Sequence, residues 1–290
     1  MRCRYLAICG FFLVFSHYVN AKSVVYSGEE RVSYETVLLK HVLSYFPDKN
    51  YQVKGYGVYL PKGRSFDLMA KNKGIDVMVG SSTKDRETLY QPIRFPILKG
   101  LIGWRVPLIN KNTPELFAHV LTASQLKQLK PGQFHTWTDT KILEANNIEV
   151  IKGSNIQGLF KMLDKKRMDY FPRSVTEIER DLSNNANLQI MIDPYILIKY
   201  PSAYYFYVNK NNHELANDIK QGLELSLVDG SFDKIFQEAF GGVVNRLKLS
   251  QRRVFHLNNP LLLDETPIAR KELWLQLPNS PSGMNKNSFK

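Results

Sequence analysis

Short apolar stretches with the character of buried strands alternate with amphipathic helices along most of this chain. In the first part the expected strands lie at 24–26, 51–56, 75–79 and 101–109, and apolar residues three or four positions apart mark the helices between them. The alternation returns between residues 121 and 171, and again between 203 and 240. This pattern predicts an α/β protein with sheets covered by helices. A length of 290 residues allows one large domain or two of ordinary size.

The first 21 residues differ from the rest of the chain. Two arginines precede an apolar run over residues 5–15, and the segment ends in Val19-Asn20-Ala21, which suits a signal peptidase. We interpret the segment as a secretory signal peptide cleaved after Ala21. The alternative is a transmembrane anchor, but the apolar run is shorter than the roughly 20 residues that a span requires.

The cysteine content and the net charge limit which metals, ligands and partners this chain can bind. Both cysteines, Cys3 and Cys9, lie in the leader, so the chain from residue 22 onward has no disulfide, thiol nucleophile or cysteine-ligated metal. The net charge of +12 becomes +10 without the two leader arginines. This basicity suits nucleic acid, an anionic membrane surface, anionic ligands or simply a basic surface. No nucleic-acid motif accompanies it and the histidines are scattered, so we expect no nucleic-acid partner, no metal and no cofactor.

A polar loop follows the expected strand at 75–79. It contains Thr83 and, three residues later, Arg86. Ligands of open α/β sheets gather at the carboxyl ends of strands, and a planar guanidinium suits a carboxylate or a phosphate. The loop therefore suggests a site for a small anion. The alternative is an ordinary solvated arginine.

Helix caps and a long tail complete the local signals. Ser65, Ser154 and Ser174 are each expected to cap a helix, and Glu177 follows Ser174 at the spacing of a capping box. Residues 243–290 show little periodicity and many Asn, Pro and Arg. We interpret them as a tail that is packed to about Leu277 and then disordered.

The order of these elements resembles the type II periplasmic solute-binding proteins, the group that includes the polar amino-acid binders of ABC transporters. The resemblance covers residues 24 to about 241. Its motifs are Gly74-Ile75-Asp76, Thr83-x-x-Arg86, Phe95-Pro96-Ile97, Arg167-Met168-Asp169 and Leu227-Val228-Asp229-Gly230. It implies a two-lobe periplasmic-binding-protein type II fold, α/β in class, with the lobes joined by two hinge strands.

The resemblance also implies domain boundaries. Lobe 1 comprises residues 22–105 and 203–245, and lobe 2 with its hinges comprises 106–202. The tail, 246–290, is expected to pack on lobe 1. The hinge strands are expected near 105–109 and 197–202, where Pro107 and Pro201 suit a crossover or an edge strand.

A narrower resemblance extends through the tail. It is to a little-characterised branch of exported solute-binding-like proteins of Gram-negative bacteria. Its motifs are Gly100-Leu101-Ile102-Gly103-Trp104-Arg105, Trp137-x-Asp139-Thr140, Asp169-Tyr170-Phe171-Pro172-Arg173, Tyr200-Pro201, Asn259-Pro260-Leu261 and Glu272-Leu273-Trp274. This second resemblance supports the fold and a periplasmic location, and it says little about the ligand.

By the resemblance, Arg86 holds a ligand carboxylate, with Ser81 and Thr83 as partners in the same loop. The alternative for these two residues is turn chemistry. Across the cleft, Trp137 and Thr138 lie where a helix N-terminus could face an anion. Trp137 could also stack on a ligand or lie in the core. Asp139 is expected to cap that helix rather than to contact a ligand.

Arg173 and Ser174 mark a departure from the amino-acid binders, which carry an aspartate where this chain has Ser174. Without that acid a ligand ammonium lacks its charged partner. Arg86 and Arg173 together favour a ligand with two acidic groups or a phosphate. The alternative is that Arg173 faces solvent or pairs with Glu177 or Asp169. Weaker candidates for the cleft lining are the aromatic residues Tyr26, Tyr34, Tyr170 and Phe171.

The sequence thus predicts a monomeric periplasmic solute-binding protein, not an enzyme. It would close around a small anionic ligand for an ABC permease or a sensor kinase in the inner membrane. One alternative is a dehydratase-like enzyme on the same fold, for which Glu177 is the acid that the sequence nominates. Another is an exported adaptor without a ligand.

Overall fold

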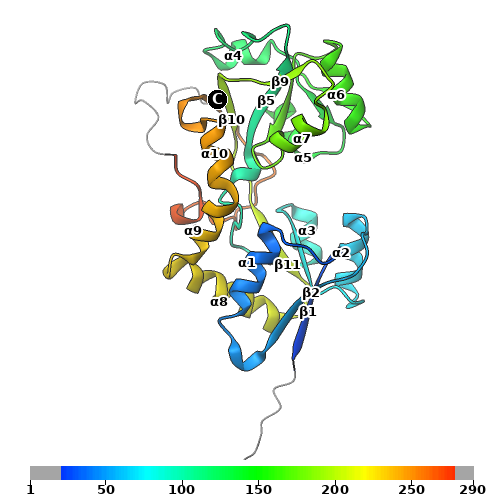
Figure 1. The fold of residues 1–290 in the computed structure, drawn as a ribbon, viewed down its shortest axis with the longest axis vertical. Helices are drawn as coiled ribbons and strands as arrows, with labels where there is room; N and C mark the ends of the chain where they lie inside the picture. Colours follow the sequence, from blue (N-terminus) through cyan, green and yellow to red (C-terminus); the bar gives the residue numbers. More distant parts are fainter. Residues whose placement is uncertain (1–20, 278–290) are drawn as a thin grey trace, which may run out of the picture.

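The computed structural model describes residues 21–277, which form two lobes stacked along the long axis of the molecule (Figure 1). This two-lobe α/β architecture agrees with the expectation from the sequence. The predicted leader, apart from Ala21, and the predicted disordered end after Leu277 lie outside the described residues. Within residues 21–277, none of the helices combines the length and the apolar content that crossing a bilayer takes.

Lobe 1, the lower half of Figure 1, is built on a five-stranded sheet. The strands in spatial order are β2 (Tyr51–Gly55), β1 (Lys22–Tyr26), β3 (Val77–Ser81), β11 (Tyr204–Val208) and β4 (Gln91–Ile93). β1 runs parallel to β2 and β3, whereas β11 is antiparallel to β3 and β4. The helices of this lobe are α1 (Tyr34–Leu43), α2 (Lys62–Ala70), α3 (Lys84–Leu89), α8 (His213–Val228) and α9 (Ser231–Phe236).

Lobe 2 is built around β5 (Trp104–Asn110), which is buried along its whole length. The other strands of its main sheet are β12 (Arg253–His256), β10 (Ile196–Lys199), β8 (Tyr170–Ser174) and β9 (Ile190–Ile192). A separate parallel pair is formed by β6 (Gly132–Phe134) and β7 (Ile151–Gly153). The helices are α4 (Ala123–Lys127), α5 (Thr138–Ala145), α6 (Ile156–Asp164), α7 (Ile178–Asn184) and α10 (Gly242–Arg246).

Two neighbouring segments form the hinge between the lobes. One is the 3-10 turn Leu101–Gly103 before β5, and the other is the stretch 200–203 between β10 and β11. The Tyr200 amide donates to the Gly103 carbonyl at 3.1 Å. A Cβ on Gly103 would lie 2.1 Å from the Tyr200 carbonyl oxygen, so the approach requires glycine. Residues 105–109 form the centre of the lobe 2 sheet, where Pro107 faces Pro172 of β8.

Two further segments also run between the lobes. α9 continues through a π-helical turn at Gln237–Gly241 into α10, which lies beside the upper lobe in Figure 1. Phe232 of α9 is buried in the lobe 1 core, whereas Val243 of α10 is buried in a lobe 2 core. After β12 the chain returns to lobe 1, where Leu273 is fully buried in the core.

The sequence predicts that the tail packs on lobe 1, whereas its described part, residues 246–277, packs on both lobes. β12 pairs in parallel with β10 over four residues and covers what would otherwise be the exposed edge of the lobe 2 sheet. Phe255 of β12 is fully buried with Ile196 and Ile198 of β10. Nothing in the periodicity of so short a strand shows which sheet it joins.

Two of the serines that were expected to cap helices, Ser65 and Ser154, do not cap them. α2 begins at Lys62, so Ser65 lies inside the helix and is buried rather than at its start. Asn155, not Ser154, caps α6, and its side chain accepts from the Gly158 amide. Either residue type can accept this bond, so the pattern alone does not fix the position.

The expected capping box at Ser174 and Glu177 is absent. Ser174 is the last residue of β8, and its hydroxyl lies 3.0 Å from that of Thr176. α7 begins only at Ile178, and Glu177 makes no side-chain capping bond. The Glu177 carboxylate instead accepts a hydrogen bond from Arg173. A bond between two charged groups is stronger than a capping bond to a backbone amide, so Arg173 sets the orientation of Glu177.

Candidate functional site

A cavity of about 810 Å³ lies between the two lobes, and we call it the cleft. Lobe 1 lines it with residues from α1, α2, β3, α3 and β11, and lobe 2 lines it from α5, β8 and α7. The charged and polar residues that matter below are Glu35, Lys62, Ser81, Arg86, Arg105, Trp137, Thr138, Asp139, Arg173, Glu177, Arg180, Asp181 and Tyr200. The cleft thus lies between lobes joined at the hinge, as the resemblance implies.

Arg86 is held in the cleft by its own loop. Thr83 caps α3, and its hydroxyl accepts from the Arg86 amide at 3.3 Å. The Nη1 group donates to the Ser81 carbonyl at 2.6 Å, and the guanidinium carbon lies 5.2 Å from the centre of the Phe66 ring. Arg86 forms no ion pair with any carboxylate in residues 21–277. Its remaining N–H groups are therefore available to an anion.

Arg173, unlike Arg86, already has carboxylate partners in the protein. It is 5 % exposed, its Nε donates to Asp181 at 2.6 Å, and its Nη2 donates to Glu177 at 3.1 Å. Its guanidinium also lies 4.8 Å from the centre of the Trp137 ring. The sequence interpretation left open a pairing with Glu177, and the structure shows that pairing together with one to Asp181. The positive charge of Arg173 is thus already balanced by protein carboxylates.

Trp137 stands at the start of α5 and forms part of an aromatic layer. Its ring stacks on Phe171 of β8 with the centroids 6.2 Å apart and the planes 13° apart. Arg173 packs on the Trp137 ring, so that face is already occupied by a cation. The indole therefore borders the cleft and at the same time supports Arg173.

Asp139 has a role that the sequence did not indicate. Its carboxylate forms an ion pair with Arg105 at 2.6 Å and accepts a hydrogen bond from the Tyr200 hydroxyl. The Arg105 Nε donates to the same Tyr200 hydroxyl at 2.9 Å. Burial raises the pKa of Tyr200 well above its usual range, which keeps the phenol protonated. Asp139 is therefore a partner of the hinge residues rather than a helix cap.

The net charge of the cleft lining is small. The lining cations are Lys62, Arg86, Arg105, Arg173 and Arg180, and the anions are Glu35, Asp139, Glu177 and Asp181. Five positive charges against four negative ones leave a net of +1. A cleft with this balance suits a molecule with both signs of charge, or a single negative charge, better than a dianion.

Glu35 and Lys62 are two further charged residues on the lobe 1 side of the cleft, and no ion pair joins them. Glu35 lies in the first turn of α1, is partly buried, and makes no hydrogen bond or ion pair within residues 21–277. Enclosure between the lobes lowers the pKa of Lys62 to about 8, with the charge of Arg86 acting in the same direction and Glu35 opposing it. The Lys62 side chain is still in contact with solvent. The lowered pKa therefore comes from protein atoms that surround the cleft, and not from burial of Lys62 in a hydrophobic core.

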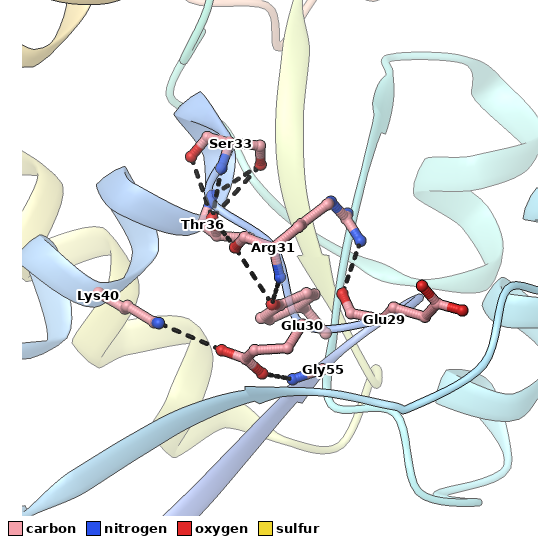
Figure 2. Close-up of polar contacts among 8 residues, drawn as sticks. Glu29, Glu30, Arg31, Ser33, Thr36, Lys40 and Gly55 are labelled. Carbon is pink, nitrogen blue, oxygen red and sulfur yellow. Dashed lines mark hydrogen bonds and ion pairs between the residues drawn. The ribbon is translucent and has the colours of Figure 1, made fainter.

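Polar contacts hold the loop between β1 and α1 and the start of α1 (Figure 2). The Tyr26 hydroxyl accepts from the Arg31 amide at 3.0 Å, and Glu30 accepts from the Gly55 amide at 2.7 Å and from Lys40 at 3.4 Å. Ser33 and Thr36 form the capping box that begins α1. Another cavity, of about 420 Å³, lies beside this loop, and Glu35 and Lys62 line both this cavity and the cleft.

The predicted site residues divide into three groups. The structure brings Arg86, Ser81, Trp137, Thr138 and Arg173 to the cleft lining. Thr83 lines an adjoining cavity of about 670 Å³ that is also walled by tail residues 260–263. Tyr170 and Ser174 are fully buried and do not border the cleft.

The placement of Tyr170 and Ser174 follows from the pleat of β8. Tyr170 packs edge-on against Phe117 with the ring centres 5.2 Å apart, in the lobe 2 core. Ser174 faces Arg105 across the sheet, but its hydroxyl is turned to Thr176. Burial raises the pKa of the Tyr170 phenol, so this group stays neutral in the core.

The sequence interpretation missed several residues of the cleft. Glu35, Lys62, Arg180 and Asp181 are exposed or helical positions whose local pattern carries no signal of a site. Arg105 lay within a quoted motif, Gly100 to Arg105, but was not assigned a role. In residues 21–277 no group of three or more His, Cys, Asp or Glu side chains is arranged to hold a metal ion.

Comparison with solved structures finds the same fold in amino-acid-binding proteins. A probable amino-acid ABC transporter extracellular-binding protein, ytmK of Bacillus subtilis, is 15 % identical, with a TM-score of 0.57 over 76 % of this chain and 98 % of that chain. The second substrate-binding domain of Lactococcus lactis GlnP, in its open conformation, is 14 % identical, with a TM-score of 0.52 over 76 % and 95 %. An ancestral amino acid-binding protein, a precursor of cyclohexadienyl dehydratase, is 12 % identical, with a TM-score of 0.50 over 75 % and 95 %.

These likenesses establish the fold class. The chain has the two-lobe type II fold of the polar amino-acid-binding proteins of ABC transporters. No protein-family model matches the sequence, and neither does any curated protein. At these levels of identity the neighbours define the architecture and leave the ligand to be argued from the cleft itself.

Proposed function

We propose that this protein binds one small solute in the cleft between its lobes. The observation that carries the proposal is Arg86, a cleft arginine held by its own loop with no carboxylate partner in residues 21–277. A concave site with a few convergent polar groups at a domain interface is the usual form of a ligand site. The fold supports the same role, since its neighbours are binding proteins.

The ligand that fits best carries a carboxylate together with an ammonium, as an amino acid does. The dianion favoured by the sequence depended on two uncompensated arginines, but Arg173 is paired with Glu177 and Asp181. Glu35 supplies the unpaired carboxylate that the sequence did not show. Arg86 would take the ligand carboxylate and Glu35 the ammonium. The neighbours named arginine- and amino-acid-binding proteins support this choice.

The proposed setting is the periplasm, with an inner-membrane partner. The leader-like first 21 residues and the fold both support export. An ABC permease is the partner that the fold favours, and a sensor kinase is the alternative. The bound and free forms would differ in how the lobes close, and the partner would read that difference.

A thermal-shift screen tests the proposal. The library holds amino acids, dicarboxylates, phosphorylated compounds and aromatic acids. A ligand at roughly 100 times its dissociation constant stabilises the protein by about 2.7 kcal/mol. We expect an amino-acid hit that Arg86→Ala abolishes and Glu35→Gln weakens, while Lys220→Ala, at an exposed lysine of α8 outside the cleft, leaves it unchanged.

Each other outcome has a definite meaning. A dicarboxylate or phosphate hit that is insensitive to Glu35→Gln would contradict the assigned ligand class. A hit that is consumed over time would favour a dehydratase-like enzyme, which the ancestral neighbour makes a relevant comparison. A silent screen would overturn solute binding and favour an adaptor.

A further inference from the structure

A second cavity, of about 230 Å³, lies at the hinge and is roofed by the tail; we call it the hinge cavity. Its volume is several times the roughly 30 Å³ share of a water molecule in the liquid. It shares only Tyr200 with the cleft lining. Its lining residues are Lys99, Gly100, Trp104, Lys199, Tyr200, Pro201, His256, Ile268, Lys271, Trp274, Leu275 and Gln276.

The floor of the hinge cavity is one row of side chains across three strands. In the sheet register Trp104 of β5 is opposite Lys199 of β10, and Lys199 is opposite His256 of β12. Residues directly opposite each other project on the same face of a sheet. Arg105, the next residue along β5, therefore projects to the other face, where it joins the cleft.

The roof is the last described part of the tail. The Leu275 amide donates to the Lys99 carbonyl at 2.8 Å, and the Trp274 indole donates to the Pro267 carbonyl at 2.9 Å. Trp274 packs against Gly100, where a Cβ would come within 2.7 Å of the ring. Leu273 anchors this segment in the lobe 1 core. The hinge cavity exists because the tail lies across the hinge in this way.

The charge in the hinge cavity is of one sign. Lys199, Lys271 and His256 line it together with Lys99, and among residues 21–277 no Asp or Glu lines it. Lys99 is satisfied by an ion pair with Asp233. Lys199 has no carboxylate and no hydrogen-bond acceptor in residues 21–277; its ammonium lies 4.0 Å from the centre of the Trp104 ring. A partly buried ammonium without an anion is unfavourable.

We propose that the hinge cavity is an anion-binding site that takes a small oxyanion, a carboxylate or a phosphate. Lys199 at the floor and Lys271 at the roof would contact the oxyanion, and His256 would donate a ring N–H. The site joins β10 and β12 of lobe 2 to the tail segment fixed on lobe 1. An anion there would link the two lobes at the hinge.

Two arguments favour an anion over an empty or water-filled cavity. Burial lowers the pKa of Lys199 to about 8, and this penalty on the charged form would be relieved by a bound anion. The surrounding protein first and the charge of Lys199 second lower the pKa of His256, although its side chain keeps contact with solvent. The proposal does not depend on the ligand of the cleft.

Tryptophan fluorescence provides a direct test. The chain has three tryptophans, and two of them, Trp104 and Trp274, line the hinge cavity. In the full chain carrying Trp137→Phe, the emission reports on the hinge cavity alone. Inorganic phosphate and acetate are titrated separately at constant ionic strength, with chloride as the balancing ion, so that the two arms distinguish phosphate from carboxylate.

We expect a saturable change in emission with at least one of the two anions. Lys199→Gln should weaken the binding about tenfold or more, as the loss of a charge-assisted contact does. Lys220→Gln, at an exposed lysine of α8 outside the cavity, should leave it unchanged. Because Lys271 is exposed, Lys271→Gln should fold normally and weaken the binding as well.

The proposal is overturned if neither anion produces a saturable change. It is also overturned if Lys199→Gln and Lys271→Gln bind as tightly as Lys220→Gln. Amino-acid binding in the cleft is measured separately by the thermal-shift screen, so failure of one site is distinguishable from failure of the other.

Discussion

Two arginines of the same cleft illustrate how much depends on the partner of a charged side chain. Arg173 has two carboxylates within hydrogen-bond distance and an indole beneath it. Arg86 contacts a backbone carbonyl and an aromatic ring, and it has no carboxylate partner in the described part of the chain. The first arginine is neutralised by the fold, whereas the second retains positive charge for a ligand.

Replacing Arg86 should therefore have a large effect on the affinity for the solute. We expect Arg86→Ala to weaken binding by about 2–4 kcal/mol, because it leaves a ligand carboxylate unpaired in the cleft. Arg86→Lys should recover part of this loss, since an ammonium keeps the charge but not the planar fork of donors. Calorimetric titration with the screening hit measures both. Equal affinity of Arg86→Ala and the wild type would place the carboxylate elsewhere.

The partly buried Lys199 gives a prediction about stability and pH. Its pKa is about 8 in the folded chain, against an ordinary value of 10.5, and the nearby titratable groups are Lys99 with Asp233, Tyr200, His256 and Lys271. Below pH 8 Lys199 is protonated in both the folded and the unfolded state, so the full cost of burying its charge lowers the free energy of unfolding. Between pH 8 and 10.5 the folded state loses the proton first, and stability rises with pH.

Lys199→Met should consequently stabilise the anion-free protein at pH 7. The pKa difference corresponds to about 3 kcal/mol, and the contact with Trp104 offsets part of it, so we expect about 1–3 kcal/mol. The advantage over wild type should shrink above pH 8 and vanish above about 10.5. Chemical denaturation at several pH values measures it. A destabilised Lys199→Met at pH 7 would show that the ammonium already has a strong partner.

At the scale of elements, β12 decides how the tail behaves. It supplies the outer strand of the lobe 2 sheet, next to β10, and places Phe255 in the core. α10 is docked on the same lobe by a two-bond ion pair between Arg246 and Glu179. The pair is largely exposed, so most of the docking energy must come from apolar burial rather than from charge.

The role of β12 predicts the cost of removing Phe255. The side chain is fully buried, so Phe255→Ala should destabilise the protein by about 3–5 kcal/mol through lost burial and a cavity. Val228→Ala, at a residue of α8 that is 86 % exposed, is the control and should change stability by about 0.5 kcal/mol or less. Urea-unfolding midpoints compare them. Similar midpoints for the two variants would mean that the tail is not part of the folded core.

At the scale of the whole molecule, the connections between the lobes limit how they move. Besides the two hinge segments, the α9–α10 helix and residues 257–270 run between the lobes. Phe240, at the π-helical turn, packs against the cores of both lobes. Each added connection restricts the rotations that a two-strand hinge would allow.

We therefore expect the free protein to hold one lobe arrangement. Lys84 of α3 and Lys141 of α5 line the same cavity from opposite lobes, so cysteines at both positions report on closure. With Cys3 and Cys9 replaced by serine, spin labels at the two positions should give a single narrow distance distribution. Two populations in the absence of solute would show that the lobes hinge freely despite the extra connections.

The sequence by itself determined the α/β class and the Thr83–Arg86 loop at the edge of the cleft, and its resemblance to the periplasmic solute-binding proteins implied the two-lobe fold. Strand and helix periods are local properties, and the Thr83–Arg86 spacing sets its own loop, so neighbouring residues were enough to predict them. The tertiary structure alone decided that Arg173 is neutralised, that Glu35 faces the cleft, and that the tail crosses both lobes. These features depend on which distant groups meet, and partners such as Arg105 with Asp139 or Lys199 with His256 are far apart along the chain.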